Sequence, residues 1–274
     1  MTEPTRMHGR VLIIAGSDSG GGAGIQADIK TVTALGAFAA TAITAVTVQN
    51  TLGVTGIHPV PVATVTAQIR AVLSDIGADA IKTGMLASGE LIDTVFSLLK
   101  REAPNVPLIV DPVMVAKGGA SLIDKDSIHA MKARLLTRAT LITPNLPEAE
   151  ALTGRKIATV EAMRAAMKAL LELGAKSALL KGGHLPGDAV VDIYAGPDGT
   201  QEWSDTRIDT RHTHGTGCTL ASAIATGFAQ GLNAVDSIAR ARAYVRRAME
   251  TAPGLGAGHG PLNHAHTVRP FTEE

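Results

Sequence analysis

Residues 11 to 24 read Val11-Leu12-Ile13-Ile14-Ala15-Gly16-Ser17-Asp18-Ser19-Gly20-Gly21-Gly22-Ala23-Gly24. The apolar half of this stretch is typical of a strand that is buried on both faces of a sheet. Beyond the glycines, apolar side chains recur at helical spacing, at Ile25, Ile29, Val32 and Leu35. The stretch therefore predicts a strand, a glycine-rich loop and a helix, which is the repeating unit of α/β proteins.

The loop glycines match neither common nucleotide-binding motif. The pattern G-x-G-x-x-G with an acidic residue about 20 positions later is not met, and G-x-x-x-x-G-K-[ST] occurs nowhere in the chain. A turn that requires positive φ angles would explain the glycines equally well. Asp18 nevertheless follows the first strand, at the position where α/β proteins bind ligands.

The alternation of strand and helix continues along the chain. We expect strands with their turns at 41–48, 79–85, 107–114, 140–143 and 177–184, and helices around 65–73, 91–99, 128–135 and 161–173. The turn Gly196-Pro197-Asp198-Gly199 predicts an antiparallel hairpin over 189–208, and two long helices should follow at 216–230 and 234–251. The sequence thus predicts an α/β fold, with a mainly parallel central sheet, helices on both faces and a small antiparallel hairpin. We expect one domain over 10–266, with tails at 1–9 and 267–274.

Composition excludes several classes of protein. The 25 basic and 25 acidic residues balance, so no overall charge attracts nucleic acid or an anionic membrane. The chain has a single cysteine and hence no internal disulfide, and its first ten residues contain no apolar segment. Because no stretch approaches the roughly 20 apolar residues of a membrane span, we expect a soluble cytoplasmic protein that binds neither nucleic acid nor membrane.

A second glycine-rich stretch, Thr213-His214-Gly215-Thr216-Gly217-Cys218, stands directly before a run of small and apolar residues. This pattern predicts a tight turn into a helix, whose first N–H groups form an anion site. Cys218 is the only cysteine, and the helix dipole should lower the pKa of its thiol. A glycine-rich helix start without a ligand, with Cys218 as a small buried side chain, remains the alternative at this point.

Polar residues and glycine turns stand at the ends of several expected strands. They are Asp18, Gln49, Met85 with its turn, Asp111, Asn145, Glu148 and Lys181. Ligands of open α/β sheets bind beyond the carboxyl ends of the strands. An anion-binding turn, carboxylates suited to a hard divalent cation and a lysine together indicate a phosphoryl-transfer site.

These motifs, in this order, resemble the hydroxymethylpyrimidine/phosphomethylpyrimidine kinases of thiamine biosynthesis, which belong to the ribokinase-like superfamily. The resemblance covers about residues 10–266 and rests on Gly16–Asp18, Gly21–Asp28, Thr44–Thr51, Lys82–Met85, Asp111–Met114, Thr143–Glu148, Lys181–His184 and Thr213–Cys218. It implies a three-layer sandwich. It also implies an ATP- and Mg²⁺-dependent kinase that phosphorylates 4-amino-5-hydroxymethyl-2-methylpyrimidine and then its monophosphate.

The resemblance implies roles for residues on the substrate side. Gln49 matches the position that hydrogen-bonds the pyrimidine, and an amide suits an aminopyrimidine edge because it offers a donor and an acceptor. Met85 and Val115 would line the ring pocket, and Gly16 and Asp18 would border it. Considered alone, Gln49 would be a turn residue and Met85 a core residue.

On the nucleotide side, the resemblance implies that Asn145, Lys181, Thr213 and Gly215 bind ATP. Glu148 and Asp111 would hold Mg²⁺, although a helix start and an ordinary strand-end acid explain them as well. The amides of Gly215, Thr216, Gly217 and Cys218 would stabilise the phosphoryl group, together with Lys181. Cys218 would accept the proton of the substrate hydroxymethyl group.

Two other functions remain open from the sequence. Pyridoxal kinases share the scaffold and the cysteine, and a non-catalytic vitamin- or nucleotide-binding module could keep the fold. The resemblance also suggests a homodimer. His214, His259, His264 and His266 match no zinc-binding spacing, so we expect no metal site there.

Overall fold

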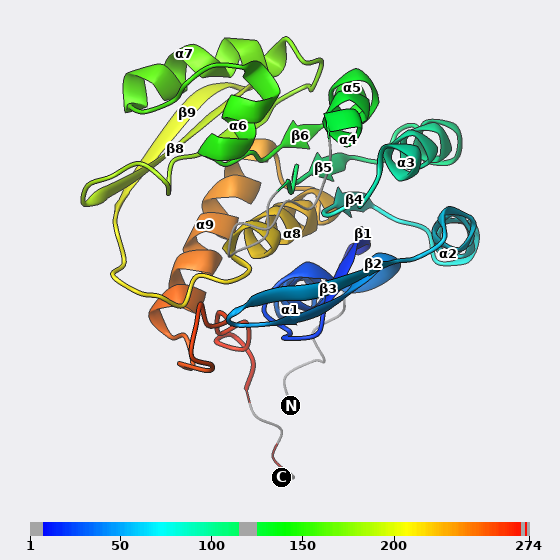
Figure 1. The fold of residues 1–274 in the computed structure, drawn as a ribbon, viewed down its shortest axis with the longest axis horizontal. Helices are drawn as coiled ribbons and strands as arrows, with labels where there is room; N and C mark the ends of the chain where they lie inside the picture. The colour runs from blue at the N-terminus through cyan, green and yellow to red at the C-terminus, as the bar shows by residue number, and fades with distance from the viewer. Residues whose placement is uncertain (1–7, 115–124, 270–271, 273–274) are drawn as a thin grey trace.

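The computed structural model describes residues 8–114, 125–269 and 272. Its described part contains one sheet of nine strands in the order β3-β2-β1-β4-β5-β6-β7-β8-β9 (Figure 1). The strands are β1 (Arg10–Asp18), β2 (Phe38–Asn50), β3 (Gly53–Pro59), β4 (Ala80–Thr83), β5 (Leu108–Val110), β6 (Leu141–Ile142), β7 (Ala178–Lys181), β8 (Ala189–Gly196) and β9 (Gly199–Thr206). Neighbours from β2 to β7 are parallel, whereas β3, β8 and β9 pair antiparallel.

Helices cover both faces of the sheet (Figure 1). One face carries α2 (Val62–Asp75), α3 (Gly89–Glu102), α4 (Lys125–Ala130), α5 (Leu136–Arg138), α6 (Leu146–Thr153) and α7 (Val160–Leu171). A π-helical turn, Met131–Leu135, joins α4 to α5. The other face carries α1 (Gly24–Ala34), α8 (Thr216–Ala229) and α9 (Ala234–Glu250). The predicted α/β sandwich of three layers is confirmed.

Successive side chains of β1 pack into two separate hydrophobic cores, one on each face of the sheet. Leu12 and Ile14 belong to the cluster under α2, α3 and α7, whereas Val11 and Ile13 belong to the cluster under α1 and α8. Successive strand residues point to opposite faces, so a run of consecutive apolar residues can fill both cores. All four side chains are fully buried. This is the two-face burial that the apolar run predicts.

The hairpin β2–β3 was not predicted. Residues 53–59 contain Gly53, Gly56 and Pro59, and their side chains are half-buried or exposed. Apolar residues alternate along a strand when one of its faces is buried. No face of this segment is buried, so its sequence shows no such alternation. The expected strand at 107–114 is also shorter, since only Leu108–Val110 is paired.

The other expected elements agree within a few residues. The predicted hairpin over 189–208 is β8–β9, and the two predicted C-terminal helices are α8 and α9. In α1 the buried face includes Ile25, Asp28 and Val32, whereas Ile29 is partly exposed at 37%. A charged side chain thus occupies a core position in this helix. No helix in the described residues has the length and apolar character needed to span a membrane.

Candidate active site

The order of the strands brings the candidate residues to one edge of the sheet. Strands β2 and β4 flank β1 in the sheet, so the direction in which successive strands are added reverses at β1. Ligands of doubly wound sheets bind at such a switch point, beyond the carboxyl ends of the strands. Asp18, Gln49, Asp111, Asn145 and Lys181 all lie at or just beyond these ends.

The turn at 213–217 meets this edge as the N-terminus of α8. Gly215 caps the helix with a φ of 86°, a conformation that favours glycine. A side chain on Gly215 would overlap the carbonyl oxygen of Gly22, so the turn and the β1–α1 loop lie backbone against backbone. Thr216 is fixed by a hydrogen bond from its hydroxyl to the Thr213 carbonyl at 3.1 Å. The Thr216 amide donates to the Thr213 carbonyl at 3.4 Å, and the first bond within the helix runs from the Thr219 amide to the Gly215 carbonyl at 2.9 Å. The amides of Gly217 and Cys218 lie between these two, at the helix positions where an anion binds.

Lys181 lies beside this turn. Its ammonium donates to Asp111 Oδ1 at 3.1 Å, and Thr143 Oγ1 donates to the same oxygen at 3.0 Å. A Cβ on Gly217 would lie 3.4 Å from Lys181 Nζ and 3.5 Å from Asp111 Oδ2. Burial alone would lower the pKa of the Lys181 ammonium, but Asp111 and Glu148 outweigh it, so the pKa is raised. A positive charge therefore lies beside Gly217 at the N-terminus of α8.

Asn145 and Glu148 form a capping box at the start of α6. Glu148 N–H donates to Asn145 Oδ1 at 2.9 Å, and Asn145 N–H donates to Glu148 Oε2 at 2.8 Å. The helix start considered for these residues is thus present. Burial, opposed by Lys181, raises the pKa of the Glu148 carboxyl to about 7. A cation arriving beside Glu148 would displace a proton from part of the molecules at neutral pH.

The expected lowering of the Cys218 pKa is wrong. Burial raises the pKa of the thiol to about 11; Lys82 opposes this, and Asp28 and Asp111 add to it. Desolvation of the thiolate is the largest cause, so the position of Cys218 at a helix start gives the wrong direction for its pKa. At pH 7 only about one molecule in 10⁴ carries the thiolate, by the definition of a pKa four units above the pH.

A buried ion pair beneath the helix start was missed as a site feature. Lys82 Nζ lies 2.8 Å from Asp28 Oδ2, and both side chains are inaccessible to solvent. Ser222, one helical turn after Cys218, donates to Asp28 Oδ1 at 2.6 Å. The pair ties β4 and α1 to the first turns of α8. A lysine within the buried strand Ala80–Thr83, matched by an acid on the buried face of α1, was the sequence pattern that could have revealed it.

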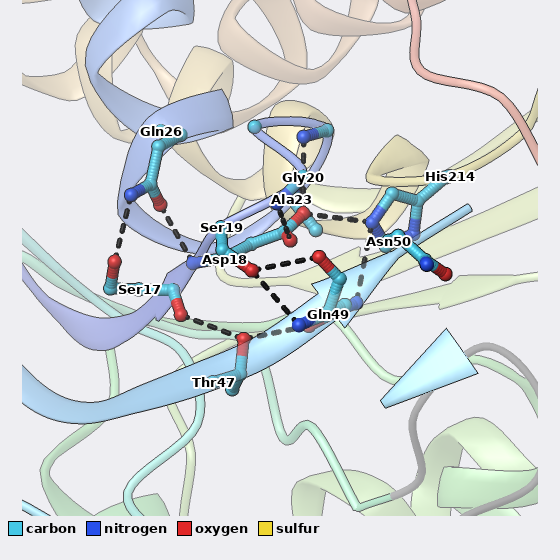
Figure 2. A network of polar contacts seen from close by, with 12 residues as sticks. Ser17, Asp18, Ser19, Gly20, Ala23, Gln26, Thr47, Gln49, Asn50 and His214 are labelled. Carbon is cyan, nitrogen blue, oxygen red and sulfur yellow. Dashed lines mark hydrogen bonds and ion pairs between the residues drawn. The ribbon is translucent and has the colours of Figure 1, made fainter. Parts of the chain in front are cut away.

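Asp18 organises the glycine loop after β1 (Figure 2). Its carboxylate accepts hydrogen bonds from the amides of Gly20, Gly22 and Ala23 at 2.8, 3.0 and 2.8 Å. His214 Nε2 lies 2.9 Å from Asp18 Oδ2. Burial raises the pKa of the Asp18 carboxyl, but these hydrogen bonds outweigh it, so the pKa lies below its usual value. Asp18 thus joins the loop to the turn at 213–217.

Gln49 lies at the end of β2, facing the same loop (Figure 2). Its main chain is held by Ser19, whose hydroxyl donates to the Gln49 carbonyl at 2.7 Å and accepts from the Gln49 amide at 2.9 Å. The side-chain amide lies between two neighbours. Thr47 Oγ1 is 3.0 Å from Gln49 Oε1, and His214 Nε2 is 3.4 Å from Gln49 Nε2. Gln49 is therefore a structured part of the site.

Met85 and Gly16 lie next to each other at the ends of β4 and β1. A Cβ on Gly16 would come within 2.6 Å of Met85 Cε. The absence of a side chain at Gly16 thus makes room for Met85, which is 8% exposed. Thr44 Oγ1 donates to the Met85 carbonyl at 2.6 Å and fixes the turn. Val115, the remaining expected pocket residue, lies outside the described residues.

The structure thus brings the predicted residues into two adjoining groups. Lys181, Asp111 and Gly217 lie together on the anion side. Gln49 and Asp18 lie together on the other, where both contact His214, the residue directly before Gly215. The sequence predicted no role for His214 beyond the absence of a metal site, yet the structure buries it, at 6% exposure, against Asp18 and Gln49. Of the described residues, none forms a cluster of three or more His, Cys, Asp or Glu side chains suited to a metal ion.

Comparison with known proteins gives one consistent family. A family model described as phosphomethylpyrimidine kinase matches residues 18–263. The hydroxymethylpyrimidine/phosphomethylpyrimidine kinase of Bacillus subtilis is 47% identical over 256 residues, which are 93% of this chain and 94% of the relative. The thiamine biosynthesis bifunctional protein ThiED of Geobacter sulfurreducens is 53% identical over 93% of this chain, and the chain spans 52% of its length.

Solved structures show the same fold. A phosphomethylpyrimidine kinase from Clostridium difficile 630 has a TM-score of 0.77 at 40% identity, covering 86% of this chain and 97% of that one. The pyridoxal kinase of Bacillus subtilis, solved as an ADP complex, has a TM-score of 0.87 at 33% identity, covering 94% and 98%. Two vitamin kinases therefore share this architecture with the chain.

Proposed function

Because this chain belongs to the phosphomethylpyrimidine kinase family, we propose that it transfers the γ-phosphoryl group of ATP to 4-amino-5-hydroxymethyl-2-methylpyrimidine and then to its monophosphate. The observation that carries the proposal is the meeting of three groups at one sheet edge. These are the Gly215 turn, the Lys181 ammonium beside it, and the Gln49 amide across the β1–α1 loop. A phosphate site and an amide suited to an aminopyrimidine thus adjoin each other.

In this proposal the chain acts mainly by positioning and by stabilising charge. The transition state of phosphoryl transfer is loose, so equatorial oxygens carry most of the developing charge. The first-turn amides of α8 and the Lys181 ammonium are fixed before the substrate binds, and they need no reorganisation as that charge develops. Asn145 forms a β-bridge with Lys181, and Thr213 accepts a hydrogen bond from the Thr216 hydroxyl in the turn before α8; both would contact the nucleotide.

Asp111 and Glu148 fit a magnesium ion. The hydrogen bonds to these side chains from the described residues use Asp111 Oδ1 and Glu148 Oε2, so Asp111 Oδ2 and Glu148 Oε1 are the oxygens each carboxylate has to offer. Mg²⁺ is usually held by one or two carboxylates together with water and substrate phosphates. When bound, the ion would neutralise phosphate charge. The Lys181 ammonium would continue to hold Asp111 in place beside it.

Cys218 is our candidate for the group that accepts the hydroxymethyl proton. Since its pKa is raised to about 11, the thiol is the resting form, and proton transfer would come late in the reaction. We expect Cys218→Ala to lower kcat far more than it weakens ATP binding. Cys218→Ser, which keeps a proton-transferring group, should retain more activity. An unchanged kcat in Cys218→Ala would remove the residue from the mechanism.

The direct test measures ADP formation by purified protein with each pyrimidine in turn. Lys181→Met should lower kcat/KM by at least about 100-fold, because it removes a buried charge facing the phosphates. Lys156→Met is the matched control, since the Lys156 side chain is 93% exposed. If neither pyrimidine stimulates ATP consumption, the proposal is wrong. Calorimetry that shows binding without turnover would favour the non-catalytic module.

Pyridoxal kinase is the second candidate. It is favoured by the TM-score of 0.87 to the pyridoxal kinase of Bacillus subtilis, which exceeds the 0.77 to the Clostridium difficile enzyme. Sequence identity favours the pyrimidine, at 40% against 33% for the same two structures. Comparing kcat/KM for the pyrimidine and for pyridoxal decides between them.

We also propose a homodimer that uses the edge formed by β2 and β3. Val46, Val48, Leu52 and Ile57 are exposed there by 46, 63, 72 and 40%. An exposed apolar edge of a sheet is commonly covered in an assembly. Light scattering should give twice the mass of the 28.2 kDa chain. A single domain over 10–266 and a cytoplasmic location also remain our proposals, supported by the family match over 18–263 and by the single cysteine.

A further inference from the structure

The side-chain amide of Gln49 is held between two groups whose protons can be assigned. On one side lies His214 Nε2, and on the other lies Thr47 Oγ1 (Figure 2). An amide can present either its oxygen or its amino group to a neighbour, because a half-turn about its last torsion exchanges the two. The hydrogen-bonding capacity of the neighbours therefore decides which way the amide points.

His214 Nε2 must carry a proton. It lies 2.9 Å from Asp18 Oδ2, and the Asp18 carboxylate already accepts three main-chain N–H bonds. An ionised carboxylate only accepts hydrogen bonds, so the imidazole nitrogen is the donor in this contact. A nitrogen that carries a proton cannot accept another from an amino group. With the Gln49 amino group toward His214, two donors would face each other at 3.4 Å, whereas the amide oxygen can accept a share of the Nε2 proton that is donated mainly to Asp18 Oδ2.

Thr47 leads to the same orientation from the opposite side. Its hydroxyl has one proton, and two oxygens compete for it: the Ser17 carbonyl at 2.9 Å and Gln49 Oε1 at 3.0 Å. The Ser17 carbonyl can only accept. If Thr47 donates to Ser17, its lone pairs are free to accept from Gln49. An amino group at that position, instead of an oxygen, satisfies all three groups.

We propose that His214 and Thr47 hold the Gln49 amide with its oxygen toward His214 and its amino group toward Thr47. The site then accepts a heterocycle edge with only one order of hydrogen-bond donor and acceptor. In this orientation one amide proton and one lone pair of the amide oxygen remain for the substrate. On an aminopyrimidine, the ring nitrogen can accept the amide proton while the neighbouring amino group donates to the amide oxygen. A ring N–H beside a carbonyl presents a donor and an acceptor in the opposite order and does not match. His214 is then a positioning residue that acts through Gln49.

The same contact ties recognition of the ring to the phosphoryl site. His214 directly precedes Gly215, and its amide donates to the Gly260 carbonyl at 3.1 Å. A Cβ on Gly22 would come within 3.2 Å of Pro261 Cβ and would overlap the His214 ring. The main chain of the β1–α1 loop at Gly22 therefore packs directly against the imidazole ring, with no room for a side chain between them.

The test rests on the proposed function and compares two pyrimidines in ATP-consumption assays. One is the 4-amino substrate, and the other is its 4-oxo analogue, in which the donor and acceptor at the ring edge are exchanged. We expect the wild type to prefer the amino compound in kcat/KM by at least about 100-fold, because a wrongly paired edge leaves polar groups unsatisfied. His214→Leu should reduce this preference about tenfold or more, with the larger change in KM.

Matched variants separate orientation from packing. His214→Gln returns a donor near the Nε2 position and should restore the preference, whereas Thr47→Val should weaken it and Thr47→Ser should retain it. Thermal unfolding shows that each variant is folded. Equal loss of preference in His214→Leu and His214→Gln, or an unchanged preference in both His214→Leu and Thr47→Val, overturns the proposal.

A second readout does not depend on activity. Nitrogen-15 NMR of the wild-type protein without substrate should show His214 with a proton on Nε2. Finding the neutral form that is protonated only on Nδ1 overturns the proposed orientation, whatever the substrate. If neither pyrimidine is phosphorylated while Nε2 is protonated, the proposed function fails and the amide orientation stands.

Discussion

Replacing Lys82 by methionine tests the buried ion pair beneath α8. The substitution nearly keeps the length of the side chain but removes the charge that lies 2.8 Å from Asp28 Oδ2. Asp28 would then keep only the hydrogen bond from Ser222. Both partners are completely buried, so the remaining carboxylate must stay charged without compensation or bind a proton. We expect the free energy of unfolding to fall by about 3–5 kcal/mol.

For a chain of 274 residues this loss corresponds to a Tm lower by roughly 6 to 20 °C, at about 2–4 °C per kcal/mol. The double variant Lys82→Met/Asp28→Leu removes both charges and should regain most of the lost stability, because apolar pairs often replace buried ion pairs without cost. Lys168→Met is the control. It breaks an exposed pair, Lys168–Glu172, whose side chains are 87 and 61% exposed, and should change Tm little.

Urea unfolding followed by circular dichroism measures these differences, and calorimetry gives Tm directly. The reasoning is refuted if Lys82→Met costs no more stability than Lys168→Met. It is also refuted if the double variant is as unstable as the single one, because the loss would then come from packing and not from an unpaired carboxylate.

Three further outcomes are expected. Alkylation of Cys218 by iodoacetamide should be slow at pH 7 and accelerate about tenfold per pH unit toward pH 11, and a plateau below pH 8 would contradict the raised pKa. The Glu148 pKa is raised from 4.5 to about 7, so the folded state binds this proton more tightly than the unfolded state. The stabilisation that comes from binding this proton is therefore present below about pH 4.5 and is lost as the pH rises to 7. Glu148→Gln should flatten this part of the plot of unfolding free energy against pH, and a pH series of urea titrations would reveal the change. Gly215→Ala should abolish activity, since its Cβ would overlap the Gly22 carbonyl, whereas Gly231→Ala has nearly the same φ in open space and should cost only about 1–2 kcal/mol of stability.

The layered fold could be predicted because its information is local. The apolar run at 11–16 and the helical spacing after it are visible in the sequence, and parallel sheets make their strands continuously apolar. The β2–β3 hairpin could not be predicted in this way. Its second strand, Gly53–Pro59, is an edge strand with few buried side chains, so pairing and not amphipathicity defines it.

In the candidate site, the residues at strand ends were predictable, but their partners were not. Lys181 and Asp111 are 70 positions apart, and only the register of β5 to β7 brings them together. The thiol of Cys218 shows the limit most clearly. Its place at a helix start is a local property and predicts a lowered pKa, whereas its burial is a property of the whole molecule and raises the pKa.

The contacts that close the site join the two ends of the sequence. His214 and Asp18 are 196 positions apart, and Ser222 and Asp28 are 194 apart. During synthesis the N-terminal strands and α1 therefore emerge long before α8, the helix that covers Asp28 and Lys82. A nascent chain that ends before residue 213 has a sheet with one face only partly covered and a charged pair open to water. Ribosome-bound chains of increasing length should become protease-resistant only after α8 has left the exit tunnel.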